Sequence, residues 1–130
     1  MSDARPNLLL IMTDQQRGDC LSIDGHPVLQ TPNMDSLGAG GARFRRGYTT
    51  CPSCVPARRS ILTGQYPATH GMVGMQGGVE WNPHTTLPQA LRDAGYQTIF
   101  VGRTMHQHPR WKRYGFEEFC PSITAGTAVA

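Results

Sequence analysis

Two apolar stretches, far apart in the chain, predict buried β-strands. Residues 7–12 form a continuous run, Asn-Leu-Leu-Leu-Ile-Met, which is typical of a strand covered on both faces in a parallel sheet. Residues 97–101, Gln-Thr-Ile-Phe-Val, predict a second strand that ends at Gly102. Residues 44–48 indicate a shorter strand. Helical patterns lie between these segments, so we predict an α/β fold with a largely parallel sheet.

A first helix is predicted after residue 31. Thr31 suits the N-cap position and Pro32 the first helical position, where its missing N–H is no loss. We expect Met34 and Leu37 to form the buried side of this helix. It should end at the glycines that follow, Gly38, Gly40 and Gly41.

Another helix is predicted over residues 86–94. Thr86 and Gln89 stand at the spacing of a capping box, and Gly95 is placed to end the helix. Its apolar residues recur at the spacing of an amphipathic helix: Leu87, Ala90, Leu91 and Ala94.

Residues 54–64, Cys-Val-Pro-Ala-Arg-Arg-Ser-Ile-Leu-Thr-Gly, predict a third helix with unusual chemistry at its start. Pro56 fits the first turn, Gly64 fits a left-handed cap, and Ile61 and Leu62 should anchor the helix in a core. Arg58 follows Cys54 by one turn, so its guanidinium can fold back over the sulfur position. A cation beside the positive end of a helix dipole stabilises an anion.

Polar residues follow the first predicted strand directly. Ligands of open α/β sheets bind beyond the carboxyl ends of the strands, and Asp14 and Gln15 stand at that point. Their side-chain oxygens are hard ligands that suit Ca²⁺ or Mg²⁺. The alternative for Asp14 is a structural role as a helix or turn cap.

Composition narrows the classes of function. The formal net charge of +3 over 130 residues is too small, and the arginines too scattered, to indicate nucleic-acid binding. The apolar run near the N-terminus is too short for a signal peptide or a membrane span, so we expect a cytoplasmic protein without membrane association. Arginines gather around residue 54, which suits a small anionic substrate, although we expect Arg43 and Arg59 to be solvated surface residues.

The four cysteines show no disulfide framework. Cys51 and Cys54 form a Cys-x-x-Cys pair, which leaves half a zinc site or a redox pair as alternatives, but no second metal-binding pair stands at suitable spacing. His70, in Tyr-Pro-Ala-Thr-His-Gly, is expected to be a packing or turn residue.

Residues 54–64 resemble the type I sulfatase signature, Cys-x-Pro-x-Arg followed by an apolar pair and Thr-Gly, with Ile61 where leucine is commoner. Further segments resemble that family: Pro-Asn, an apolar run and Thr-Asp-Gln at 6–15, Thr-Pro-Asn-Met-Asp-Ser-Leu at 31–37, residues 66–71, Gly-Tyr-Gln-Thr at 95–98, Gly-Arg-Thr-Met-His at 102–106, and residues 114–119. The resemblance implies a three-layer α/β/α fold of the alkaline-phosphatase-like kind and the hydrolysis of sulfate esters.

The same resemblance implies roles for individual residues. Cys54 is converted to formylglycine, whose hydrated aldehyde is the nucleophile, by a formylglycine-generating enzyme. Asp14, Gln15 and the modified Cys54 bind a divalent metal, for which Ca²⁺ is expected first and Mn²⁺ or Mg²⁺ are alternatives. Arg58 and Arg103 hold sulfate oxygens. His106 binds an oxygen or moves a proton.

Three departures from the family pattern affect these roles. Gln15 replaces the commoner second aspartate, Arg103 replaces a lysine, and His106 arrives one residue late. A planar guanidinium in place of a lysine keeps the charge and changes its geometry. For His106, a surface or packing role stays an equal alternative.

The resemblance covers nearly the whole chain, with a matching core at 7–119 and tails at 1–6 and 120–130. Family members are much longer, and their second pair of metal ligands has no counterpart here. We therefore expect the chain to be the N-terminal part of a sulfatase catalytic domain, with little activity alone.

The expected substrate is a sulfate ester, either a small molecule or a sugar. The alternatives are a phosphonate monoester or phosphodiester hydrolase of the same superfamily, or a truncated protein without catalysis. The oligomeric state is left open.

Overall fold

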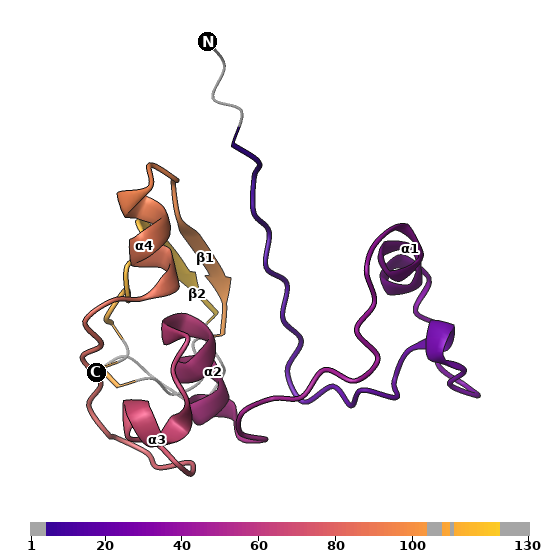
Figure 1. Cartoon of the computed structure of the whole chain (residues 1–130), viewed down its shortest axis with the longest axis horizontal. Helices are drawn as coiled ribbons and strands as arrows, with labels where there is room; N and C mark the ends of the chain where they lie inside the picture. Colours follow the sequence, from indigo (N-terminus) through magenta and orange to yellow (C-terminus); the bar gives the residue numbers. More distant parts are fainter. Residues whose placement is uncertain (1–4, 104–107, 110, 123–130) are drawn as a thin grey trace. The chain divides into compact units, whose positions relative to one another are not determined.

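The computed structural model describes residues 5–103, 108, 109 and 111–122. These residues form two compact units, Met1–Gly47 and Tyr48–Ala130, each of which is described by itself (Figure 1). No helix in the described ranges has the length and apolar character needed to cross a membrane.

The first unit contains the short 3₁₀ helix η1, Ser22–Asp24, and the helix α1, Pro32–Gly40. α1 begins with Pro32 after Thr31, as predicted, but the Thr31 side chain caps no helical N–H. It instead accepts a hydrogen bond from the Ser22 N–H at 2.9 Å and donates one to the Asp35 carboxylate at 2.7 Å. Ser22 Oγ donates to the same carboxylate at 2.5 Å. These three side chains hold η1 against α1, and the Ser22 hydrogen bond lowers the pKa of Asp35.

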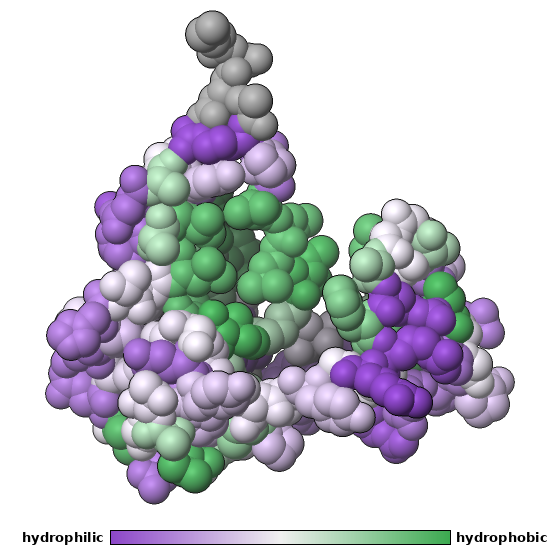
Figure 2. All heavy atoms as spheres, viewed as in Figure 1, coloured by the Kyte–Doolittle hydropathy of each residue, from purple (hydrophilic) through white to green (hydrophobic). Residues whose placement is uncertain are grey.

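The predicted strand at residues 7–12 is wrong for this chain. This run forms neither helix nor strand, and its leucines are exposed, Leu9 by 85% (Figure 2). A buried strand is stable only where neighbouring strands pair with its backbone and apolar layers cover it, and the described residues of this unit form no other strand. The burial predicted for α1 is also wrong, since Leu37 is 70% exposed and Met34 is exposed as well.

The strand predicted at residues 44–48 is absent too. The chain makes a turn at Arg45 and Arg46 instead. Arg43 and Arg45 both approach Asp24, at 3.6 and 3.4 Å, and these ion pairs bend the segment back toward η1. Arg43 is thus a partner of a carboxylate rather than a purely solvated residue.

The second unit carries the remaining elements: α2, Cys54–Thr63; α3, Pro67–His70; α4, Leu87–Asp93; β1, Ile99–Gly102; and β2, Glu118–Pro121. The helix predicted at 86–94 and the strand predicted at 97–101 are confirmed within two residues at each end. β1 and β2 pair in parallel, from Ile99 opposite Glu118 to Gly102 opposite Pro121. The prediction of a parallel sheet is confirmed, although β2 itself was not predicted.

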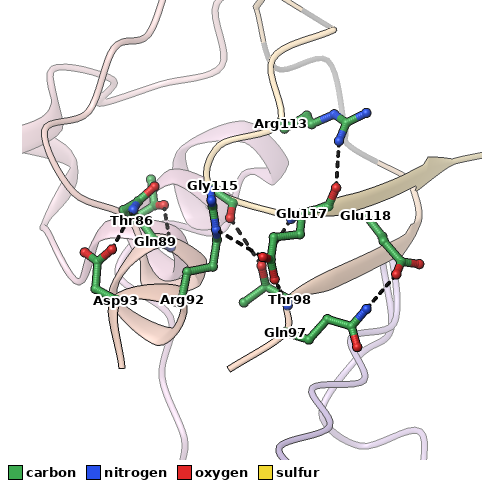
Figure 3. A network of polar contacts seen from close by, with 10 residues as sticks. All are labelled: Thr86, Gln89, Arg92, Asp93, Gln97, Thr98, Arg113, Gly115, Glu117 and Glu118. Carbon is green, nitrogen blue, oxygen red and sulfur yellow. Dashed lines mark hydrogen bonds and ion pairs between the residues drawn. The ribbon is translucent and has the colours of Figure 1, made fainter. Parts of the chain in front are cut away.

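Polar contacts around Glu117 hold α4 and the two strands together (Figure 3). The Glu117 carboxylate accepts a hydrogen bond from the Thr98 N–H at 3.0 Å and lies 3.8 Å from Arg92 of α4. Gln97 donates to Glu118 across the strand pair at 2.7 Å. At the start of α4, Thr86 Oγ1 accepts from the Gln89 N–H, which confirms the cap.

Aromatic side chains pack on one face of the β1–β2 pair, whereas the side chains on its other face are exposed. Phe100 and Phe119 stack with their ring centroids 5.1 Å apart, and Phe116 joins them. On the other face Val101 is 76% exposed and Ile99 is exposed as well. The apolar stripe predicted for α4 is also not its buried face, because Pro88 is the only buried residue among those of α4.

Candidate functional site

Cys54 is the first residue of α2, as predicted. Ser53 precedes it in an extended conformation, and the Ser53 carbonyl accepts the first helical hydrogen bond, from Ala57 N–H at 3.0 Å. Gly64 ends the helix with φ 68°, the left-handed cap expected of it. The Cys54 thiol is free, and the half-buried residue lies at the positive end of the helix dipole.

The buried face of α2 is not the predicted one. Its four buried residues are Val55, Pro56, Arg59 and Ser60, whereas Ile61 is 42% exposed. Val55 and Arg59 are four residues apart, as are Pro56 and Ser60, and residues four apart share one side of a helix, so these four residues form one continuous stripe. Cys54 and Arg58, at i and i+4, form another stripe, which points away from the first.

Arg58 reaches the end of β1. Its Nη1 donates a hydrogen bond to the main-chain carbonyl of Arg103 at 3.2 Å, immediately after Gly102 ends the strand. The structure therefore brings Arg58 and Arg103 together at the carboxyl end of a parallel strand, where ligands of α/β sheets bind. The third residue predicted for this rim, His106, lies outside the described residues.

Arg59 follows Arg58 on α2, and the expectation that it is a solvated surface residue is wrong. Its exposed fraction is 2%. Its Nη2 donates to the Val79 carbonyl at 2.7 Å, and its guanidinium lies over the Trp81 ring, 5.0 Å from the centroid. Burial lowers the pKa of Arg59. The spacing of four from Val55 was the available signal, since it puts both on one helix face.

A series of side-chain hydrogen bonds lies on the same face of α2. Ser60 Oγ accepts a hydrogen bond from Thr50 Oγ1 at 3.0 Å and contacts His70 Nε2 at 3.1 Å. His70 Nδ1 accepts from the Met72 N–H at 3.3 Å, which leaves the ring proton on Nε2. Burial lowers the pKa of His70 and favours this neutral form. His70 is thus a packing and turn residue, as predicted, at the end of α3.

The described residues contain no group of three or more His, Cys, Asp or Glu side chains able to hold a metal ion. A zinc site at Cys51 and Cys54 therefore has no further ligands in that part of the chain, and the Cys51 thiol points to the Val73 carbonyl at 3.7 Å. Asp14 and Gln15 lie in a bend of the first unit, and Gln15 has φ 56°, a conformation rare outside glycine. Their oxygens fit Ca²⁺ in kind, but two residues are fewer than the six to eight oxygen ligands, roughly, that Ca²⁺ takes.

Known proteins resemble this chain in sequence and in structure. The sulfatase family model matches residues 6–130. An arylsulfatase of Clostridium perfringens is 44% identical over 112 residues, which are 86% of this chain and 23% of that protein. A solved structure described as a complex with its substrate, D-glucosamine-2-N,6-O-disulfate, superposes with a TM-score of 0.80 at 33% identity, over 94% of this chain and 24% of that one.

A second solved structure belongs to the phosphonate monoester hydrolase of Agrobacterium radiobacter. It superposes with a TM-score of 0.73 at 32% identity, over 90% of this chain and 25% of that one. The chain thus spans about a quarter of the length of these relatives. The helices and parallel strands described above form part of the alkaline-phosphatase-like α/β fold, as predicted. The chain belongs to the sulfatase family.

Proposed function

We propose that this protein is a sulfuric ester hydrolase whose nucleophile is made from Cys54, and that the chain forms the N-terminal part of its catalytic domain. The observation that carries the proposal is the start of α2. A free, half-buried cysteine is the first residue of the helix, and Arg58, one turn later, reaches the carboxyl end of β1. Sulfated sugars are the proposed substrate class. The solved structure that superposes with a TM-score of 0.80 is described as a complex with its substrate, a disulfated glucosamine.

The proposed chemistry depends on converting Cys54 to formylglycine. When formed, the hydrated aldehyde would supply two hydroxyls on one carbon. One would attack sulfur and displace the alcohol of the ester, and deprotonation of the other would then expel sulfate and restore the aldehyde. The N–H groups at the start of α2 favour negative charge at this position. Arg58 adds a fixed cation, whose planar fork matches a tetrahedral oxyanion through two of its oxygens. Arg103 is proposed to hold a further sulfate oxygen.

A divalent cation is proposed to complete the charge balance at the sulfate. Asp14 and Gln15 would supply oxygen ligands to it, with Ca²⁺ as the metal best suited to such donors. Cys54 as a further ligand stays a prediction. An Asp14→Asn variant is expected to weaken binding of Tb³⁺, a luminescent substitute for Ca²⁺, whereas Asp19→Asn, also in the first unit, leaves it unchanged.

Mass spectrometry tests the nucleophile directly. Trypsin cleaves after Arg46 and Arg58, so a single peptide, residues 47–58, carries both Cys51 and Cys54. After co-expression with a formylglycine-generating enzyme, we expect residue 54 to carry an aldehyde that reacts with a hydrazide, and Cys51 in the same peptide to remain a thiol. An intact thiol at residue 54, under conditions that convert a known sulfatase peptide, contradicts the proposal.

Hydrolysis of phosphonate monoesters is the second candidate function. The similarity to the Agrobacterium radiobacter hydrolase favours it, and Gln15 in place of a second aspartate suits either branch. Both candidates use the same modified residue, so the peptide experiment does not separate them. The two candidates are separated by measuring the rates at which the protein that contains this chain hydrolyses an aryl sulfate and a phenyl phosphonate ester. A preference for the phosphonate would replace the first proposal with the second.

A further inference from the structure

Arg59 is a buried cation to which the proposed chemistry assigns no role. Its guanidinium has no carboxylate partner within the described residues, and its Nε is buried without a hydrogen-bond acceptor. Leaving a charged group with an unpaired donor in a core is costly, and an apolar side chain of similar length would avoid that cost. The contacts that Arg59 does make therefore need an explanation beyond packing.

Those contacts fix α2 to a segment that is distant in sequence. The hydrogen bond to the Val79 carbonyl is short, at 2.7 Å, and the Trp81 ring lies under the guanidinium. Trp81 in turn packs on Tyr114, with the ring centroids 5.1 Å apart, and both residues belong to the buried core of this unit. A flat cation held by an acceptor and by a ring has one preferred direction, which an aliphatic side chain lacks.

The direction of Arg59 determines where Cys54 and Arg58 point. Successive residues of an α-helix are about 100° apart around its axis. Arg58 then lies about 40° from Cys54, and Arg59 lies about 140° from Cys54. Holding Arg59 inward thus turns Cys54 and Arg58 away from the core, and Arg58 meets the Arg103 carbonyl just after the end of β1.

We propose that Arg59 is a positioning residue: its contacts with Val79 and Trp81 set the rotation of α2, and thereby the orientation of Cys54 and Arg58. This inference rests on the proposed function for its catalytic meaning. The orientation itself can be measured on the unmodified thiol, so a failure of either proposal can be told from a failure of the other.

The test compares thiol reactivities within one molecule. The full chain is produced without a formylglycine-generating enzyme, and alkylation of each cysteine by iodoacetamide is followed by peptide mass spectrometry. The variants are Arg59→Met, which keeps length and loses the charge, Arg59→Lys, and Trp81→Leu. Arg92→Met is the matched control, because Arg92 lies on α4 of the same unit and its side chain forms a partly exposed ion pair with Glu117. Cys120, on β2, serves as the internal reference.

We expect Arg59→Met and Trp81→Leu to change the alkylation rate of Cys54 relative to Cys120 by about threefold or more, since thiol reactivity follows exposure and local charge. Arg59→Lys, which keeps a cation over the ring and loses the fork, should give a smaller change, and Arg92→Met none. An unchanged ratio in a folded Arg59→Met protein, as judged by cooperative urea unfolding, overturns the proposal. If that variant does not fold, an unchanged ratio in Arg59→Lys and Trp81→Leu overturns it equally.

Discussion

Nη1 of Arg58 donates a hydrogen bond to the main-chain oxygen of Arg103 at 3.2 Å. This bond joins the start of α2 to the residue that follows β1, so one guanidinium links the proposed nucleophile's helix to the sheet. The acceptor belongs to the backbone, and substitution of the Arg103 side chain therefore leaves an acceptor in place. The two arginines can be tested separately.

We predict that Arg58→Ala lowers the rate of sulfate ester hydrolysis by about 10²–10³-fold in the enzyme that contains this chain, the range found for loss of one preorganised donor. Arg58→Lys should recover part of this loss, because it keeps the charge without the planar fork. Steady-state kinetics with an aryl sulfate measure the effect. Arg92→Ala, which removes another partly exposed arginine of the same unit, is the control and should change the rate little.

Gly115 is placed where a side chain has no room. Its φ is 98°, and a Cβ there would lie 2.7 Å from the Gln89 nitrogen and 2.8 Å from Thr86 Oγ1. We predict that Gly115→Ala lowers the free energy of unfolding by about 2–4 kcal/mol, as backbone strain and overpacking add. Gly78 has a similarly positive φ, 70°, and nothing within 4 Å, so Gly78→Ala should cost only about 1 kcal/mol. Equal losses in urea unfolding of the two variants would contradict this assignment.

Thr98 is buried and uses its hydroxyl twice. Oγ1 donates to the Gly115 carbonyl at 3.2 Å and accepts from the Glu117 N–H at 3.2 Å. Thr98→Val keeps the shape and removes both bonds, so we expect it to lower the free energy of unfolding by about 1–3 kcal/mol. Thr98→Ser keeps the hydroxyl and is the matched control. A Val variant that is at least as stable as the Ser variant would contradict the role assigned to the hydroxyl.

The predictions that succeeded depend on local chemistry. The start of α2 at Cys54, its end at Gly64 and the cap at Thr86 each follow from the properties of a few neighbouring residues. β1 was found because its apolar run is bounded by turn residues. β2 was missed because it has four residues, Glu-Phe-Cys-Pro, and exists through pairing with β1, which local sequence does not encode.

The failed predictions concern burial, which depends on what packs against an element. The run at 7–12 has the composition of a buried strand, and yet it is exposed because its unit offers no described strand to pair with. Ile61 was expected in the core on hydrophobicity alone, whereas Arg59 occupies the buried face because Trp81 and the Val79 carbonyl meet it there. Arginine is usually exposed to solvent, so the sequence predicts a surface position for Arg59. Only the tertiary contacts show that the residue is buried.

His70 should make stability depend on pH. Its pKa is lowered from its ordinary value of 6.5, chiefly by burial and also by the nearby Arg59 cation. The unfolded chain therefore binds a proton at a higher pH than the folded chain does, and the free energy of unfolding falls as the pH drops below about 6.5 toward the lower folded value. Protonation would also remove Nδ1 as the acceptor of the Met72 N–H.

We predict that His70→Gln weakens the loss of stability between about pH 7 and pH 5, because glutamine accepts hydrogen bonds without titrating. Urea unfolding at several pH values measures the slope. The control is His84→Gln, which replaces an exposed histidine of the same unit. His70→Gln is expected to be less stable than the wild type at neutral pH, where the native ring is neutral and makes both of its hydrogen bonds, to Ser60 and from Met72. If the two variants show the same pH slope, His70 is not the group that titrates.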